Sequence, residues 1–357
     1  MWLEKGGTDM NQTNKNPLLK SIRDNSKEAT LIAVLVVITL LLAVLTKGKF
    51  LSSAKLVSMA FQMPEFGFIA LGMMVVVLTG GINLSVINTA AMSSIFGALI
   101  ISKVFNQGEG NATVALIGGL IGITVVALLG GALNGLAVAH FGVAPMLVTI
   151  STMMIFEGVG LLITKGGAIS GFPSNYMWIG AGKILGIPFP MILYILAVIA
   201  FVILLEHTVW GRQVYMVGCN PTATYFSGVN NRSVLMRVYL LSAACGIFAA
   251  VLISSRYNSA KVDYGSSYLM KSIVATVLGG TDINGGYGKV IGTVTAVLII
   301  QAISSGLNLL NVNRFLTRHF TQYVDYEFTA RLEDELDAVS RGEEDWLPLM
   351  RGFWDPF

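Results

Sequence analysis

The sequence is poor in charged side chains and in residues that ligate metals or form disulfides. Charged residues make up 12% of its 357 residues, hydrophobic residues 54%, and the mean hydropathy is +0.71. A soluble domain of this size needs more charge to cover its surface, so most of the chain is typical of a polytopic membrane protein. Cys219 and Cys245 form no CxxC motif or disulfide framework. The three histidines, His140, His207 and His319, lie far apart, so we expect no metal site.

The few charges are unevenly distributed. Residues 1–313 carry 18 Lys and Arg against 10 Asp and Glu, whereas residues 314–357 carry 5 against 10. Half of the acids therefore lie in the last 44 residues. The first part is typical of a chain in a bilayer and the second of a soluble one, which predicts a boundary near Asn313.

Nine apolar runs approach the roughly 20 residues that a helix needs to cross a bilayer. They are residues 29–46, 64–80, 86–103, 113–139, 145–164, 188–205, 238–255, 268–281 and 289–310. Spans in lipid must be helical because lipid offers backbone groups no other partners. We therefore predict an all-α polytopic membrane protein with about nine transmembrane helices, a truncated internal repeat and a short soluble helical tail. Pro64 and paired glycines interrupt the second and eighth runs.

Positive charges give the orientation. Five Lys and Arg lie in residues 1–27, which favours a cytoplasmic N-terminal segment. Six spans would return the chain to the cytoplasm at residues 206–237, where Arg212, Arg232 and Arg237 agree. Three lysines in the first outside loop (Lys47, Lys49 and Lys55) oppose this orientation without reversing it. Residues 1–27 lack the cleavage site of a secretory signal peptide.

Two glycine-rich segments each close an apolar run: Leu78–Ser85 and Leu278–Gly286. They suggest an internal duplication, and interrupted helices in corresponding halves usually mark a translocation path. Our candidates for that path are Asn83, Ser85, Thr149, Thr152, Asp282 and Asn284. The second segment is no phosphate loop, because no Lys-Ser/Thr pair follows it and no βαβ pattern surrounds it. We therefore expect no enzyme and no ATP site here, so that pumping draws its energy from a partner.

Four ionisable residues fall near the ends of predicted spans: Glu65, Glu157, Lys271 and Asp282. At such places side chains usually extend to the membrane interface. Buried carboxylates would be needed for proton coupling, so a proton- or ion-coupled secondary transporter is the less favoured alternative.

At residues 206–237 a specific resemblance emerges. Gly211–Asn220, followed by Ala223 and Ser227-Gly228-Val229, resembles the cytoplasmic loop of ribose-type sugar permeases, from the branched-chain and sugar family of bacterial ABC importers. The resemblance covers about residues 28–312. Further matching segments are Leu78–Val86, Pro145–Thr149 with Thr152-Met153, Val277–Thr281, Gly285–Gly288 and Asn308–Leu310.

This resemblance implies a permease subunit in the bacterial plasma membrane that imports a sugar or sugar-like solute. It also implies a second permease copy or a paralogue, an extracytoplasmic solute-binding protein, and a cytoplasmic ATPase dimer that holds the ATP and Mg. The ATPase would grip a coupling helix near Pro221–Gly228. The residues implied in coupling are Gly218, Asn220, Pro221, Ala223, Ser227 and Gly228. Asn83 stands where the family usually has Asp, and Cys219 where it usually has Gly.

The tail has a different resemblance. Apolar residues at 324, 328, 332, 336 and 339 predict an amphipathic helix. Residues 313–357 resemble a fragment of bacterial type IA DNA topoisomerase that lacks the catalytic tyrosine and the acidic metal site, so we expect no strand cutting. Their acidic charge also argues against nucleic-acid binding. Because the permease family normally continues to a tenth span, we expect a chimeric reading frame, and poor assembly if the junction is real.

Overall fold

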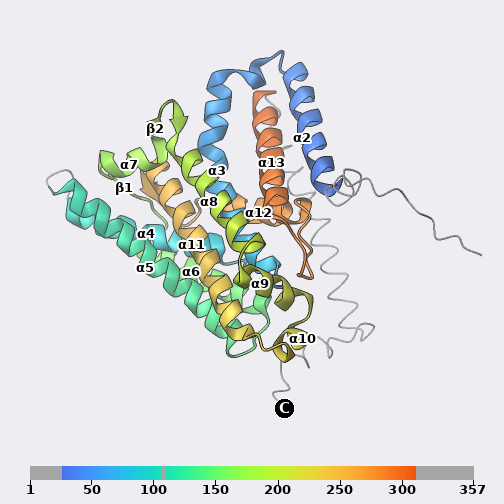
Figure 1. The fold of residues 1–357 in the computed structure, drawn as a ribbon. Helices are drawn as coiled ribbons and strands as arrows, with labels where there is room; N and C mark the ends of the chain where they lie inside the picture. Colours follow the sequence, from blue (N-terminus) through green and yellow to red (C-terminus); the bar gives the residue numbers. More distant parts are fainter. Residues whose placement is uncertain (1–25, 106–109, 311–357) are drawn as a thin grey trace, which may run out of the picture.

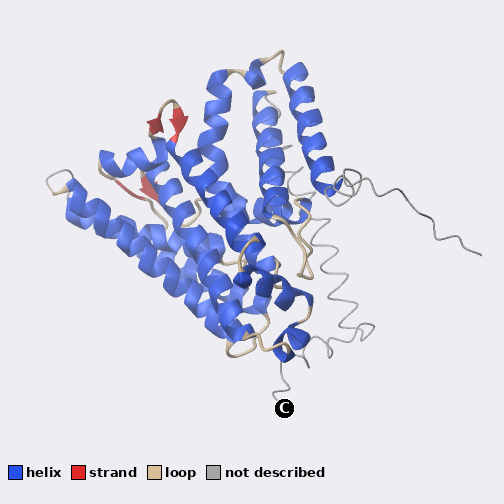
Figure 2. Ribbon diagram, in the orientation of Figure 1, coloured by secondary structure: helices blue, strands red, loops and turns tan. Residues whose placement is uncertain are grey.

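The computed structural model describes residues 26–105 and 110–310, and this part of the chain is almost entirely helical (Figures 1 and 2). The tail from 313 onwards and the segment 1–25 lie outside the described residues. Within these residues, the strands form two antiparallel pairs, and each strand is two residues long. The fold is therefore an all-α polytopic membrane protein, as predicted.

Each of the nine predicted spans coincides with a helix. They are α2 (Ser26–Leu45), α3 (Ser53–Val77), α4 (Val86–Phe105), α5 (Ala112–Ala139), α6 (Pro145–Thr164), α8 (Phe189–Glu206), α11 (Asn231–Tyr257), α12 (Ser266–Leu278) and α13 (Val290–Leu309). In the described residues, seven of these are long and apolar enough to cross a membrane, whereas α12 and the apolar part of α2 are shorter.

Two predicted boundaries are wrong. The second span was expected to begin at Pro64, but α3 begins at Ser53 and continues through this proline. A proline is tolerated inside a transmembrane helix where neighbouring helices cover the backbone, and the residues from Met63 to Val77 are all buried. The seventh span was expected from residue 238, but α11 begins at Asn231, where the Asn230 side chain accepts a hydrogen bond from Ser233 N at 3.1 Å.

Short elements occupy the two ends of the bundle (Figure 1). Near one end lie α7 (Ser174–Ala181), the β2–β3 hairpin, the β1–β4 pair and a 3-10 turn at Lys49–Leu51. The strands are β1 (Ile169–Ser170), β2 (Lys183–Ile184), β3 (Ile187–Pro188) and β4 (Ser259–Ala260). At the other end lie α9 (Val209–Cys219) and α10 (Pro221–Phe226), in the loop where a short helix was predicted.

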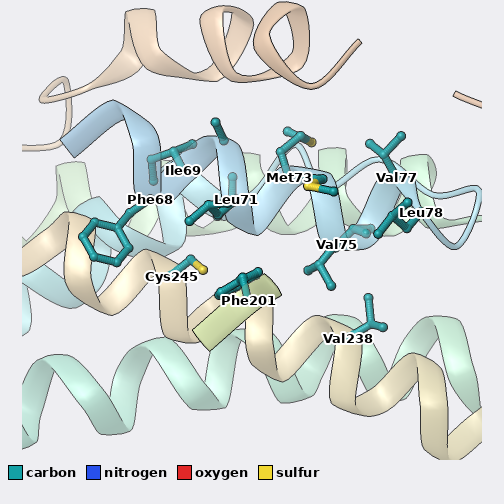
Figure 3. Close-up of a cluster of buried hydrophobic side chains, with 14 of the residues drawn as sticks. Phe68, Ile69, Leu71, Met73, Val75, Val77, Leu78, Phe201, Val238 and Cys245 are labelled. Atoms are coloured by element: carbon teal, nitrogen blue, oxygen red, sulfur yellow. The ribbon is translucent and has the colours of Figure 1, made fainter. Parts of the chain in front are cut away.

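The buried centre of the bundle is α3, which packs against α8, α11, α12 and α13. In Figure 3, the side chains from Phe68 to Leu78 lie among residues of neighbouring helices, including Cys245. By contrast α5, α6 and α8 leave many large apolar side chains exposed, as at Leu129 and Leu162. Apolar surfaces of this kind are suited to contact with lipid.

Candidate functional site

The chain between α3 and α4 leaves the helical conformation at residues 78–85, which we call the broken segment. Asn83 Nδ2 donates to Ser242 Oγ of α11 at 2.9 Å, and Ser85 Oγ donates to Asn83 Oδ1 at 2.9 Å. Asn134 Nδ2 of α5 donates to Ser85 Oγ at 2.7 Å. All four side chains are buried. The broken segment is therefore held between α5 and α11 by a network of uncharged polar groups.

Sequence reasoning predicted Asn83 and Ser85 but missed their partners, Asn134 and Ser242. Asn134 had a signal, because an amide inside a long apolar run is unusual and generally bonds another helix. Within the described residues its Oδ1 atom has no hydrogen-bond partner, although it is buried. A buried acceptor of this kind gains about 1–3 kcal/mol from a donor such as water or a solute hydroxyl.

The two predicted threonines of α6 behave differently. Thr149 Oγ1 donates to the carbonyl of Ile82 at 2.9 Å and so ties the start of α6 to the broken segment. Thr152 Oγ1 donates to the carbonyl of Val148 in its own helix at 3.0 Å. The structure therefore brings Thr149 to the broken segment, whereas Thr152 lies one helical turn further along.

The second glycine-rich segment forms a loop, residues 279–289, that lies directly against the broken segment. Gly286 N donates to the carbonyl of Leu78 at 2.9 Å, and a Cβ added to Gly285 would lie 2.5 Å from Gly80 N. Asp282 and Asn284 are exposed in this loop, and Asp282 Oδ1 accepts from Asn284 N at 2.9 Å. The predicted counterparts thus meet through their backbones, while the exposed Asp282 and Asn284 bond to each other within the loop.

The end of α9 packs onto both glycine-rich segments, and we call this contact of Gly80, Gly218, Gly285 and Gly286 the glycine junction. A Cβ on Gly218 would overlap the carbonyl oxygen of Leu78 and the amide nitrogen of Gly286. Only glycine fits this approach of three backbones.

Tyr215 of α9 adds a hydrogen bond beside the junction: its hydroxyl donates to the carbonyl of Gly288 at 2.9 Å. Burial, helped by the Glu206 carboxylate, raises the pKa of Tyr215 to about 12, so the hydroxyl remains a donor at physiological pH.

The predicted coupling residues build α10. Asn220 Oδ1 accepts from Ala223 N at 2.9 Å and caps the helix, while Pro221 occupies its first turn. Ser227 Oγ donates to the Ala223 carbonyl at 2.9 Å, and Gly228 has a φ of +83°, which suits the turn after the helix. Gly218 lies in the glycine junction instead.

Two exposed aromatic residues of α10 were not predicted. Tyr225 and Phe226 are 64% and 82% exposed, and their ring centroids lie 5.8 Å apart. Adjacent exposed aromatics on a polar loop were a readable signal, since such residues anchor protein interfaces.

The expectation that Glu65 lies near a span end is wrong, because α3 starts twelve residues earlier. Glu65 is 1% exposed and forms an ion pair with Arg256 of α11, Nη2 to Oε2 being 2.9 Å. Tyr268 of α12 donates to the same oxygen at 3.0 Å.

The other ionisable residues named above lie elsewhere. Glu157 is exposed on α6 and accepts from Asn88 Nδ2 at 3.3 Å. Lys271 Nζ lies 5.9 Å from the centroid of the Tyr268 ring.

No group of three or more His, Cys, Asp or Glu residues that could hold a metal occurs in residues 26–105 and 110–310. Cys219 is exposed, Cys245 is buried, and both are free thiols.

Comparison with known proteins gives a consistent result. Residues 55–325 match the model of the family described as branched-chain amino acid transport system / permease component, and this match runs past the boundary predicted near residue 312. The chain is 36% identical over 269 residues to the ribose import permease protein RbsC of Bacillus subtilis, covering 74% of this chain and 80% of that protein.

Two further relatives agree. RbsC of Escherichia coli K12 is 32% identical over 294 residues, which is 81% of this chain and 88% of the relative. The autoinducer 2 import system permease protein LsrD of Yersinia enterocolitica is 32% identical over 250 residues, which is 68% and 73%. No solved structure matches the chain.

Proposed function

This chain belongs to the family of branched-chain amino acid transport system permease components, and we propose that it is the membrane-spanning permease subunit of an ABC importer. Its cargo is a sugar or sugar-like small solute, and a partner subunit hydrolyses the ATP. The names of the relatives support sugar import, since these relatives are named as import permeases for ribose or autoinducer 2. This chain binds no cofactor; ATP and Mg belong to the ATPase.

The observation that carries the proposal is α10 with its exposed aromatic pair. Exposed Tyr225 and Phe226 form an apolar knob that suits a groove in a partner protein. Asn220, Pro221, Ala223, Ser227 and Gly228 shape the helix that presents this knob. An ATPase dimer that grips α10 would supply the energy for transport.

The translocation path is proposed to pass the broken segment and the loop 279–289. Asn83, Ser85 and Thr149 meet there, with Asn134 and Ser242 as additional polar groups. Asp282 and Asn284 are exposed on the adjoining loop and are suited to contact a solute or a second permease copy. Thr152 remains a candidate because it follows Thr149 by one turn.

The remaining partners and the orientation follow from the same proposal. With α9 and α10 in the cytoplasm, the end that carries α7 and the β2–β3 hairpin faces outward and receives an extracytoplasmic solute-binding protein (Figure 1). The N-terminal segment 1–27 is then cytoplasmic. A second copy or a paralogue completes the path in the plasma membrane.

The test is co-purification with an ABC ATPase encoded beside this gene. Replacing Pro221–Gly228 by a Gly/Ser linker is expected to abolish binding, whereas Leu185→Ala, at the exposed tip of the opposite hairpin, is expected to leave it intact. Retained binding by the linker variant would contradict the assignment. The alternative is a proton- or ion-coupled secondary transporter. It would be supported if an ion gradient drove solute uptake into vesicles in the absence of ATP.

For the tail we propose a chimeric origin, by recombination or sequence-assembly error, and no part in transport. Its resemblance to a topoisomerase fragment lacks the catalytic residues, so the whole chain is expected to relax no supercoiled DNA. Sequencing the source DNA across codons 300–325 tests the chimera, and a continuous native gene with a stop after Phe357 would refute the artefact. If the junction is native, the alternative is that the chimeric protein is non-functional. That alternative predicts no solute uptake even when the ATPase is bound.

A further inference from the structure

We propose that the end of α9 transmits the movement of α10 to the translocation path, with Gly218 and Tyr215 as positioning residues. This inference rests on the proposed function. The end of α9 lies between the coupling helix on one side and both glycine-rich segments on the other, so that a displacement at one contact reaches the other.

The first step concerns the joint between α9 and α10. One residue, Asn220, separates the two helices. Its backbone N donates to the carbonyl of Met216 at 3.0 Å and closes α9, while its side chain caps α10. Because the same residue ends one helix and begins the next, a displacement of α10 also displaces the end of α9.

The second step concerns the contact between α9 and the path. Gly218 meets backbone atoms of Leu78 and Gly286, and no flexible side chain lies between them to absorb a displacement. Leu78 and Gly286 are also joined to each other by a hydrogen bond of 2.9 Å. A shift of α9 therefore moves the broken segment and the loop 279–289 together.

The third step leads to the buried network. Leu78 lies five residues before Asn83, whose side chain is bonded to Ser242 of α11. Tyr215 holds the far side of the loop through the carbonyl of Gly288. The route from the coupling helix to the polar groups of the path thus runs through backbone contacts and through side-chain hydrogen bonds, among them those of Tyr215 and Asn83.

The experiment uses the full chain with its ATPase in nanodiscs. Thr79→Cys in a Cys219→Ser background places a reporter thiol in the broken segment, since the remaining Cys245 is buried. The rate of its alkylation by a maleimide is measured without nucleotide and with ATP plus vanadate, and ATP hydrolysis is measured in parallel.

The reporter is expected to change its rate about tenfold with nucleotide, within the range of allosteric coupling. Gly218→Ala should abolish that change. Tyr215→Phe should reduce it by about fivefold for one lost hydrogen bond, while ATP hydrolysis continues. The matched control is Gly158→Ala in α6, because a Cβ there meets nothing within 4 Å. Its response should equal that of the parent.

The inference is overturned if Gly218→Ala responds as the parent does, or if the parent hydrolyses ATP while the reporter shows no response. Should Gly218→Ala fail to fold, Tyr215→Phe decides in the same assay, and an unchanged response then overturns the inference. A parent chain that neither binds the ATPase nor supports its hydrolysis refutes the proposed function itself.

Discussion

Breaking the ion pair between Glu65 and Arg256 should destabilise the bundle unequally from its two sides. Arg256→Met leaves the Glu65 carboxylate 1% exposed with Tyr268 as its remaining partner. Removing one member of a buried pair costs about 3–5 kcal/mol. Glu65→Gln should cost less, about 1–3 kcal/mol, because the Arg256 side chain is 20% exposed and can reach water. The double variant Glu65→Leu/Arg256→Met should recover most of the loss, since no charge remains buried.

The assay is the free energy of unfolding in mixed detergent micelles, followed by a thiol dye. Cys245 lies buried beside α3, so in a Cys219→Ser background the dye reports the opening of the bundle. The control is Asp263→Asn, which breaks the solvent-exposed pair with Lys261 and should leave the free energy of unfolding nearly unchanged.

Two results would refute this reasoning. If Arg256→Met costs no more than Asp263→Asn, the pair contributes nothing to the packing of α3 against α11. If the double variant is as unstable as Arg256→Met, the loss comes from side-chain shape and not from an uncompensated charge.

Two further predictions concern the site, and a third concerns the packing of α6. Asn83→Asp, which introduces the acid usual in the family, should lower the free energy of unfolding by about 1–3 kcal/mol in the same assay. The substitution removes the hydrogen-bond donor to Ser242 and buries a charge in a network that holds no cation. An unchanged free energy of unfolding would show that water reaches Asn83. The double variant Tyr225→Ala/Phe226→Ala should weaken ATPase binding by about 2 kcal/mol or more, roughly thirtyfold, in a binding titration with Leu185→Ala as the control. Equal affinities of the double variant and the control would exclude the aromatic pair as the anchor. Gly160→Ala should lower the free energy of unfolding by about 1 kcal/mol, because its Cβ would lie 2.9 Å from Val262 Cγ2. Gly158→Ala should not lower it, and equal free energies for the two variants would mean that Val262 moves aside.

The sequence predicted the helices because hydrophobic length alone determines a membrane span. The short helix that the family resemblance implied near Pro221–Gly228 is present as α10, where Asn220 is the cap and Pro221 lies in the first turn. The sequence misplaced the start of α3, because a proline usually ends a helix and nothing local shows that neighbouring helices cover the backbone around Pro64.

Partners across the fold were beyond sequence reasoning. Asn83 and Ser242 are separated by 159 residues, and Glu65 and Arg256 by 191. The glycines at 80, 218, 285 and 286 were visible, but their meeting depends on the packing of α9, which local patterns do not encode.

The central position of α3 has a consequence for biosynthesis. All its main packing partners (α8, α11, α12 and α13) lie later in the chain. Arg256 follows Glu65 by 191 residues, which takes roughly 10–40 s at a ribosomal rate of about 5–20 residues per second. During that interval the carboxylate lacks its native partner, and an unpaired charge in lipid costs on the order of 3 kcal/mol. A nascent chain that stops before Arg256 therefore keeps the Glu65 carboxylate in the bilayer without the cation that pairs with it in the folded protein.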